Sequence, residues 1–464
     1  MTKSTTQWKP QSSPGLKLLL VCALALVMTI PALFVFVISY DRSSRADNTK
    51  RQIAQAAGGA QKLVGPVLAI PIEVKDDSGV WNISDTLLVF ADSGTAQADL
   101  SVTTKKKSLY AVQVYESDLV FDADFDLGFV SKFSDAGQKL RVEQAQILIG
   151  VSDLRGALDD AWLSIANKQK RKFTPFSGDI FLQNQALSTG TFRLQENARY
   201  NWQGTSMGQV LTVPVGEDMQ NDSLQVHVAM TLGGAQDFTL VPFARSSKLT
   251  LKANWPHPGF GGQYLPTSKD ITDAGFTASR TVPALASGLP PLALSSQFEN
   301  RQRFQTGMRV TLVEASSPYQ FVTRALKYAL MFIGFVFLAY FLFEMNTTRP
   351  VHAAQYVLVG LAQTVFYLLL LALSEHLGFD LAFLIAAGLI VGLTGLYAGA
   401  VFGRAKMLPA LMVFGFVYGL MFILMRLEDF ALVVGAFASF FAIATTMWMT
   451  RKMKWYADKP PECG

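Results

Sequence analysis

Residues that form disulfides and metal sites are scarce in this sequence. Only two cysteines occur among 464 residues, Cys22 inside an apolar block and Cys463 beside the C-terminus, and there are four histidines. No pair of these residues has the spacing of a metal-ligand motif. We therefore expect no metal site, and the cysteine-free central part of the chain must be stabilised by its own hydrophobic core.

Catalytic signatures are missing as well. The sequence has no nucleophile elbow, no phosphate-binding loop and no HExxH motif. A hydrolase or a nucleotide-dependent enzyme therefore has no support in the sequence. We expect a protein that has neither a catalytic activity nor a cofactor.

Charge is low and unevenly distributed. Charged residues make up 16% of the chain, and the formal net charge is +5. The segment from Asp41 to Arg324 holds 28 basic and 28 acidic residues, so the whole net charge lies in the two flanking regions. Because these regions are also the apolar ones, the basic excess indicates membrane topology, and we expect no nucleic acid partner.

Apolar segments long enough to cross a bilayer occur in both flanking regions. The first, Leu18 to Ile38, contains no charge, follows Lys17 and is closed by Asp41. A cleaved signal peptide would have a shorter apolar region that ends in small residues, so we predict an uncleaved transmembrane helix at 18–38. Five more spans of about 20 residues are predicted, at 325–343, 353–373, 381–402, 407–425 and 430–449.

Basic residues alternate with the predicted spans and indicate an orientation. The two tails, 1–17 and 450–464, together with every second connection between spans, hold ten lysines and arginines. Positive charge is retained on the cytoplasmic side, so both termini are predicted to be cytoplasmic. The long segment of about 39–324 then lies outside the cytoplasm, between the first and second spans.

In the segment between the first two spans, the residue pattern changes near residue 64 from one typical of a helix to one typical of strands. Residues 39–63 are polar and rich in Ala and Gln, which predicts a helical stalk that continues the first span. Residues 64–324 predict short strands separated by turns such as Gly233-Gly234, and one helix from Leu154 to Asn167. The strands are expected at Val64–Pro71, Thr86–Phe90, Ser108–Tyr115, Leu119–Leu127, Gln146–Val151, Thr191–Leu194, Val210–Val215, Leu224–Met230 and Lys248–Ala253.

These patterns together predict the fold class. It is a polytopic α-helical membrane protein with six transmembrane helices and a large, mainly β periplasmic domain inserted between helices 1 and 2. The five later spans form a bundle of antiparallel neighbours, because the connections between them are short. Gly388, Gly392, Gly395 and Gly399 have the small-residue spacing that favours close packing between helices.

One stretch of the β-rich domain has an unusual composition. Two prolines and three glycines predict a rigid loop from Trp255 to Gly262. Its Trp255, His257 and Phe260 side chains could clamp a ligand or a partner. The alternative, which we favour, is that the aromatic rings fill the domain core.

Charged residues gather where predicted spans end on one side of the membrane. Glu375 and His376 close the third span, and Arg426, Glu428 and Asp429 connect the fifth span to the sixth. As a functional cluster they would form an ion relay, a metal site or a docking surface for the β-rich domain. The alternative is plain interfacial polarity, which we favour because ionisable groups are functional by default only within the bilayer.

The order and spacing of several motifs resemble one known family over nearly the whole chain. In the β-rich part they are Gly65–Leu68, Val151–Gly156 and Trp255–Pro258. In the membrane part they include Phe341–Glu344, Gln355–Leu361, Phe366-Tyr367, Leu373–His376, Leu427–Leu432 and Trp455-Tyr456. The chain is thereby similar to the CreD family of inner-membrane proteins of Gram-negative bacteria. It departs from the family pattern where Gly275–Ala278 is not followed by Trp and where His352 is not followed by Pro.

This resemblance implies a physiological association of the protein, but no specific biochemical reaction. Members are linked to a two-component regulatory system, to envelope integrity, and to tolerance of colicin or β-lactam stress. We expect a non-enzymatic envelope-stress protein of the inner membrane, whose partners are the lipid bilayer and envelope proteins or cell-wall components. Two alternatives stay open: a transporter or channel that uses the charged residues at the outer membrane face, and a membrane enzyme with a Glu/His/Asp site there.

Overall fold

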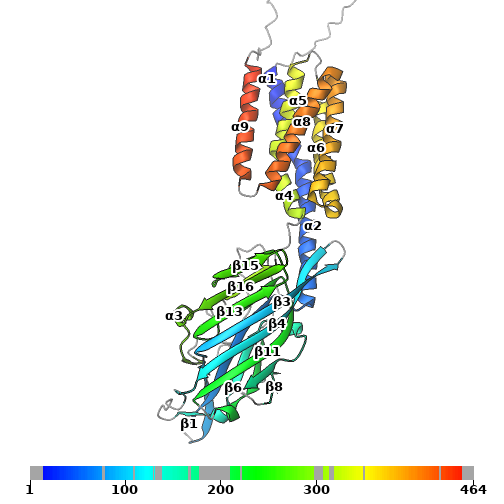
Figure 1. Ribbon diagram of the computed structural model, residues 1–464. Coiled ribbons are helices and arrows are strands. Elements are labelled where there is room, and N and C mark those ends of the chain that lie inside the picture. The colour runs from blue at the N-terminus through cyan, green and yellow to red at the C-terminus, as the bar shows by residue number, and fades with distance from the viewer. Residues whose placement is uncertain are drawn as a thin grey trace, which may run out of the picture. The chain divides into compact units, whose positions relative to one another are not determined.

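The computed structural model of the chain divides into two compact units (Figure 1). One unit comprises Met1–Ala46 and Ser316–Gly464, and the other comprises Asp47–Ala315. We call them the helical unit and the β unit. The structure describes residues 14–75, 79–107, 110–128, 130, 138–165, 169–176, 209–219, 222–296, 307–312, 318–347, 351–427 and 430–451.

The β unit consists mainly of two sheets. Among the described residues the first sheet has ten strands, seven of them in the order β14-β18-β12-β1-β6-β10-β9, with β2 and β5 also paired to β1 and β17 paired to β2. Its strands are β1 (Gln61–Lys75), β2 (Trp81–Val89), β5 (Gln138–Leu140), β6 (Gln146–Val151), β9 (Thr174–Pro175), β10 (Gln209–Pro214), β12 (Asp237–Val241), β14 (Pro258–Gly262), β17 (Leu292–Leu294) and β18 (Met308–Leu312).

The second sheet has eight strands in the described residues, in the order β15-β16-β13-β3-β4-β11-β7-β8. Figure 1 shows its long strands β3, β4 and β11 lying side by side. They are β3 (Ser93–Lys107), β4 (Tyr110–Asp126), β7 (Trp162–Ile165), β8 (Arg171–Lys172), β11 (Ser223–Ala235), β13 (Ser246–Ala253), β15 (Ser268–Thr272) and β16 (Gly275–Val282). Short helical turns, η1 (Val142–Gln144), η2 (Leu154–Gly156), η4 (Gly216–Asp218) and α3 (Ala284–Ser287), connect strands.

Alternation along the chain explains which face of each strand is buried. On β4 the side chains of Leu119, Phe121, Ala123 and Phe125 are buried, whereas Asp124 and Asp126 are exposed. Strand β1 differs, because its first thirteen residues are all buried. A strand buried on both faces belongs at the centre of a layered domain, and β1 indeed pairs with four other strands.

One aromatic ring is held between the two sheets by glycines. The buried Phe243 ring lies against Gly65 of β1 and Gly94 of β3, where an added Cβ atom would come within 2.5 and 2.6 Å of ring atoms. Gly65 and Gly94 therefore leave the space that the ring fills. This packing gives the Gly65-Pro66 segment a structural role.

Three local predictions for the β unit are wrong. In the described part of the segment Leu154 to Asn167, the expected helix is instead the turn η2 followed by strand β7, which pairs with β11. Gly233-Gly234 lies within β11 and not in a turn. The strands expected at Ser108–Tyr115 and Leu119–Leu127 are present in Tyr110–Asp126, where they form the single strand β4. The rigid loop expected up to Gly262 contains strand β14. The strand expected at Thr191–Leu194 lies outside the described residues.

The helical unit contains five helices that are long and apolar enough to span a membrane, or six if a bent pair is counted as one span, within the described residues. Its helices are α1 (Pro14–Val27), α2 (Thr29–Ala56, which continues into the β unit), α4 (Pro318–Lys327), α5 (Ala329–Met345), α6 (Ala353–Leu377), α7 (Phe379–Phe402), α8 (Met407–Arg426) and α9 (Ala431–Thr450), with the turn η5 (Arg404–Lys406) before α8. The bent pair is α4 and α5, which meet at 55°.

The first span continues from α1 into α2 through a local irregularity at Met28, whose N–H still donates to the Leu24 carbonyl at 2.9 Å. Pro31 lies four residues after Val27, and a proline ring clashes with the carbonyl at that position in a regular helix. The Met28 side chain lies against Gly360 of α6, where a Cβ atom would come within 2.4 Å of it. Gly395 and Gly399 of α7 likewise lie against side chains of α8, namely Leu411 and Met407. Gly388 and Gly392 have open space around them. Only half of the predicted glycine stripe therefore serves helix packing.

Substituting Gly65 by Ala tests the role of the glycines. We expect a loss of about 1–3 kcal/mol in the unfolding free energy, because the new methyl group overlaps the Phe243 ring. The measurement is chemical unfolding of the purified full-length protein. In a Phe243→Leu background the same change should cost less, and an equal cost in both backgrounds would refute the steric account.

Asp237 of β12 supplies a pH test. Burial raises the pKa of its carboxyl, even though Thr311 donates a hydrogen bond of 2.5 Å to it. A raised pKa in the folded state means that the contribution to stability is complete at acid pH and is lost as pH rises through the raised value. We expect Asp237→Asn to raise the melting temperature at pH 7 and to have no effect near pH 3. The exposed Asp270→Asn should change neither, and equal effects of Asp237→Asn at both pH values would contradict the prediction.

Candidate functional site around Glu375

The side chain of Glu375 lies near the C-terminal end of α6 and is only 5% exposed. Arg42 of α2 donates from Nη1 to both carboxylate oxygens, at 2.8 and 2.7 Å. The hydroxyl of Tyr319, on α4, donates to Oε1 at 3.1 Å. A buried carboxylate is costly unless it is paired and hydrogen-bonded, and these two residues provide both forms of compensation.

Helix α4 is bound to the ends of three other helices. Besides the Tyr319 contact with α6, the Phe321 ring stacks on Phe379 of α7 with centroids 4.6 Å apart. Arg324 donates from Nη1 to the carbonyl oxygen of Met425 at 3.0 Å. That carbonyl belongs to the last turn of α8, where the helix dipole favours a cation. Helix α4 thus lies against the ends of α6, α7 and α8.

The two partners of Glu375 lie on the two segments of the chain that connect the helical unit with the β unit. Arg42 lies on the helix by which the chain leaves the helical unit for the β unit, and that unit begins at Asp47. Tyr319 lies on the first helix after the chain returns, since the β unit ends at Ala315. One buried carboxylate therefore binds both of the segments that connect the two units.

The structure groups the predicted charged residues differently from the sequence prediction. Arg426 pairs with Asp380 at the start of α7, and both side chains are about half exposed. His376 is exposed, and Glu428 and Asp429 lie outside the described residues. Of the predicted cluster, Glu375 alone is shown in a buried ion pair, and its partners Arg42 and Tyr319 were not predicted.

The aromatic residues of the predicted loop pack within the β unit. Trp255 and Phe260 lie against the main hydrophobic core. The Phe260 ring meets Phe276 edge to face at 5.4 Å, and the Trp255 Nε1 donates to the His257 carbonyl at 3.2 Å. Both rings are partly buried and His257 is exposed, so the packing alternative describes Trp255 and Phe260 better than a ligand clamp does.

A second buried carboxylate, Glu344, was missed by the sequence analysis. It lies at the end of α5, where its side chain is 2% exposed and pairs with Lys17 of α1. Tyr356 donates its hydroxyl at 2.8 Å, and the backbone N–H of Val351 donates at 2.6 Å. The available signal was an acidic residue that directly follows the apolar block 325–343, with a lysine at the start of the first span.

The two carboxylates hold the N-terminal segment at both ends. Lys17 on α1 pairs with Glu344, Met28 packs on Gly360, and Arg42 on α2 pairs with Glu375. All three contacts join the first span to α5 or α6. The N-terminal segment is therefore an integral part of the helical unit and more than a simple anchor.

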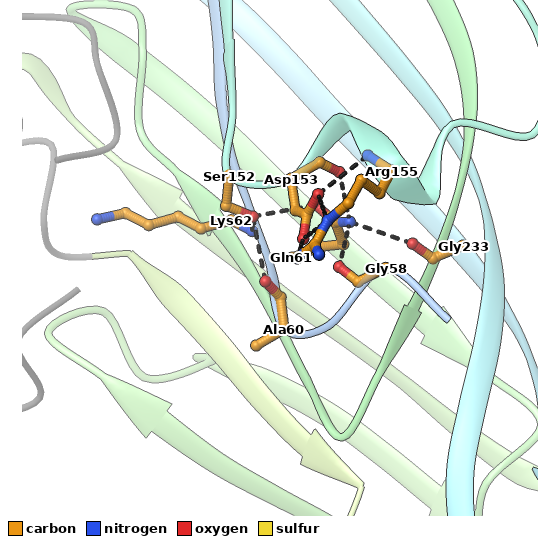
Figure 2. A network of polar contacts seen from close by, with 8 residues as sticks. All are labelled: Gly58, Ala60, Gln61, Lys62, Ser152, Asp153, Arg155 and Gly233. Atoms are coloured by element: carbon orange, nitrogen blue, oxygen red, sulfur yellow. Dashed lines mark hydrogen bonds and ion pairs between the residues drawn. The ribbon is translucent and has the colours of Figure 1, made fainter. Parts of the chain in front are cut away.

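The C-terminal end of α2 is fixed within the β unit by a buried polar network (Figure 2). Gln61, which is 1% exposed, donates from Nε2 to the carbonyl oxygens of Gly58 and Asp153 at 2.9 Å and of Gly233 at 3.2 Å. Its Oε1 accepts a hydrogen bond from Ser152 at 3.0 Å. One side chain thus joins the segment after α2 to η2 and to β11.

Neighbouring residues complete this network. The one hydroxyl proton of Ser152 is shared between Gln61 Oε1 and the Ala60 carbonyl oxygen, which lies at 3.1 Å, and the hydroxyl oxygen accepts from the Lys62 N–H at 2.9 Å. The Asp153 carboxylate accepts from the backbone and the guanidinium of Arg155. Figure 2 shows the Lys62 side chain pointing away from this cluster, and burial lowers the pKa of its amine to about 8. The network is structural, because its polar groups satisfy one another.

No group of three or more His, Cys, Asp or Glu side chains that could hold a metal ion occurs in the described part of the chain. Neither the Glu375 site nor the Glu344 site has such a donor set. What both sites do is join helices through buried charge.

Comparison with known proteins places the chain in a family. Residues 13–456 match the family described as "Inner membrane protein CreD". The chain belongs to the CreD family. It is 31% identical over 470 residues to the inner membrane protein CreD of Escherichia coli (strain K12), and the match covers 100% of this chain and 96% of that protein. The resemblance seen in the sequence is thereby confirmed.

A comparison with solved structures gave a zinc metallopeptidase of the M1 group from Deinococcus radiodurans, at 8% identity. The match covers 81% of this chain and 97% of that one, but its TM-score is 0.18. So low a score carries no argument about this CreD-family chain.

A double-mutant cycle tests the Glu375 site. We expect Arg42→Gln and Glu375→Gln each to lower the unfolding free energy by roughly 1–3 kcal/mol, because each leaves a polar partner uncompensated. The double variant should lose less than the sum of the two. Thermal unfolding in detergent measures this, and Asp380→Asn, which breaks an exposed pair, should cost less than about 1 kcal/mol. Strictly additive losses would contradict the pairing.

Proposed function

We propose that this CreD-family protein is a non-catalytic coupling protein of the inner membrane. In this proposal the β unit binds an envelope component, and its bound state is passed to the helical unit. The observation that carries the proposal is that Glu375 holds both chain connections between the units, through Arg42 and Tyr319. Coupling between two regions needs a physical element that both of them influence, and in this proposal the connecting segments α2 and α4 are that element.

Helix α2 supports this role by its continuity. It runs without a break from Thr29 to Ala56, so it includes both Arg42 and the residues that pack in the β unit. Ala54 is fully buried there beside Val112, Val114 and Ala235. The Gln61 network then holds the segment that follows. A change in the β unit that displaces the end of α2 would therefore act on a helix that also carries Arg42.

The proposed topology follows the charge distribution. We place both termini in the cytoplasm and residues of about 39–324 in the periplasm, with six spans formed when α4 and α5 count as one. In that orientation the Glu375 site lies at the periplasmic ends of the helices. The ligands we propose for the β unit are envelope proteins or cell-wall components.

The proposed physiological role is protection of the cell envelope. The family association supports a part in envelope integrity and in tolerance of colicin or β-lactam stress, under a two-component regulatory system. In this role the β unit would bind the envelope component, and the Glu375 site would hold the two chain connections that lead from it into the membrane helices.

Complementation of a deletion strain tests coupling. We expect Glu375→Gln to lose at least half of the restored β-lactam or colicin tolerance at unchanged protein level, because the α2 and α4 connections lose their common charged partner. Asp380→Asn is the matched control and should retain tolerance. The charge exchange Arg42→Glu with Glu375→Arg should recover part of the loss, whereas full tolerance of Glu375→Gln at equal protein level would overturn the proposal.

A further inference from the structure

One arginine of the β unit lies on the core-facing side of its strand. Arg280 belongs to β16, where its same-face neighbours along the strand are Ala278 and Val282, both fully buried. Directly across on β13 it pairs with Leu249, which is also fully buried. Residues two apart on a strand, and residues directly paired between antiparallel strands, have their side chains on one face of the sheet. The Arg280 side chain therefore starts among core residues.

The guanidinium of Arg280 lacks a compensating acid. Its Nε is buried and has no hydrogen-bond partner, and no carboxylate forms an ion pair with it, in the part of the chain that the structure describes. Arg309 on β18 offers a contrast, because its positive charge opposes the rise in the pKa of the nearby Asp237 carboxyl. A positive charge on the core side of a sheet is costly without an anion. Arg280 is thus a position where a ligand would supply the missing negative charge.

The end strand β15 places a second cation on this face. In Figure 1, β15 and β16 lie side by side, and β15 is the last strand of the eight-stranded sheet. Lys269 pairs directly with Ala278, so it is a diagonal neighbour of Arg280. Cβ atoms in that relation are about 7 Å apart, within reach of two long side chains. Asp270 pairs with the exposed Thr277 and so lies on the opposite face.

The two strands that carry these cations are held together on both sides of Arg280. The N–H of Thr267 donates to the Ser279 carbonyl at 2.9 Å, one residue before Arg280. The Tyr264 hydroxyl donates to the Ala286 carbonyl at 3.2 Å, beyond the end of β16. Donors that are already held in place lose less freedom when they bind an anion.

Protection of the sheet edge explains Lys269 but not Arg280. Charged side chains on end strands prevent association between the edges of two sheets, and Lys269 has that position. Arg280 lies one strand further in, where β15 already covers the edge of β16. A neutral side chain would pack there at lower cost, so the positive charge needs another reason.

We propose that Arg280 and Lys269 bind an oxyanion, a carboxylate or a phosphate group, on the envelope component that the β unit recognises. The planar guanidinium donates two parallel hydrogen bonds to such a group, and Lys269 adds a point charge beside it. This inference rests on the proposed function, because it names the chemistry of the ligand that the β unit binds.

Thermal unfolding of the purified full-length protein tests the site. Melting temperatures are compared in sodium chloride, in sodium phosphate at equal ionic strength, and with a peptide that ends in D-alanine as the source of a carboxylate. We expect phosphate or the peptide to raise the melting temperature by about 2 °C, because a ligand that binds only the folded state stabilises it. A shift with phosphate alone would assign a phosphate group to the ligand, and a shift with the peptide alone a carboxylate. No shift with either would overturn the proposal.

Two variants separate binding from folding. Arg280→Met should lose the anion-dependent shift, and its melting temperature in chloride should equal or exceed that of the unchanged protein, because an uncompensated charge is removed. Lys248→Gln, which removes an exposed charge from β13, is the matched control and should keep the shift. A shift that persists in Arg280→Met would rule out the site. A lower melting temperature of that variant in chloride would also rule it out, because Arg280 would then stabilise the fold without a ligand.

Chemical modification locates the bound anion. Phenylglyoxal labelling of Arg280, followed by peptide mass spectrometry, should fall about threefold in the stabilising anion, because the oxyanion occupies the guanidinium N–H groups. Arg155, whose side chain is 67% exposed, should be labelled equally in both solutions. Unchanged labelling of Arg280 would refute the assignment. These measurements do not involve the Glu375 site, so their failure and a failure of the coupling proposal are distinguishable.

Discussion

The buried carboxylate of Glu375 is the constraint on which the arrangement of the helical unit depends. An ionised carboxylate removed from water costs several kcal/mol unless donors replace the lost hydration. Here the donors come from α2 and α4, which are separated by more than 250 residues in the sequence. The end of α6 is therefore compensated only when both segments are in place. The helices cannot assume this arrangement as a free-standing C-terminal bundle with the N-terminal segment left apart.

Glu344, at the C-terminal end of α5, is a second buried carboxylate that needs donors from distant segments. Its partners Lys17, Val351 and Tyr356 come from α1, from the connection before α6, and from α6 itself. Membrane helices gain little from apolar packing against one another, because lipid is equally apolar, so buried polar contacts and close small-residue packing specify which helices meet. The contact of Met28 with Gly360 lies between the two ion pairs in the chain order of the first span. It is the close small-residue packing that helps to determine which helices meet.

Sequence patterns revealed the parts of this structure that depend on local chemistry. Long apolar blocks predicted the apolar helices of the helical unit, and the strand signals predicted strands such as β6. The helix predicted from Leu154 failed because Trp162 and its neighbours pair with β11, a tertiary contact that no local pattern records. Local sequence patterns do not reveal ion pairs between distant segments either. Glu375 was a candidate by its place at a span end, but nothing near it in the sequence indicates Arg42.

The pairing of β1 has a consequence for how the protein is made. Its parallel neighbour is β12, with Gln61 opposite Phe238, and β12 pairs in turn with β18, which ends at Leu312. A ribosome delivers β1 first and these partners long afterwards, and non-local strand pairing is slow because the loop must close before contacts reward it. Strands β2, β5 and β6 follow β1 early in synthesis, but residues Gln61–Val64 stay without their parallel partner until β12 is made. Unpaired strand edges favour aggregation, so this end of β1 is exposed to that risk until its late partner has been synthesised.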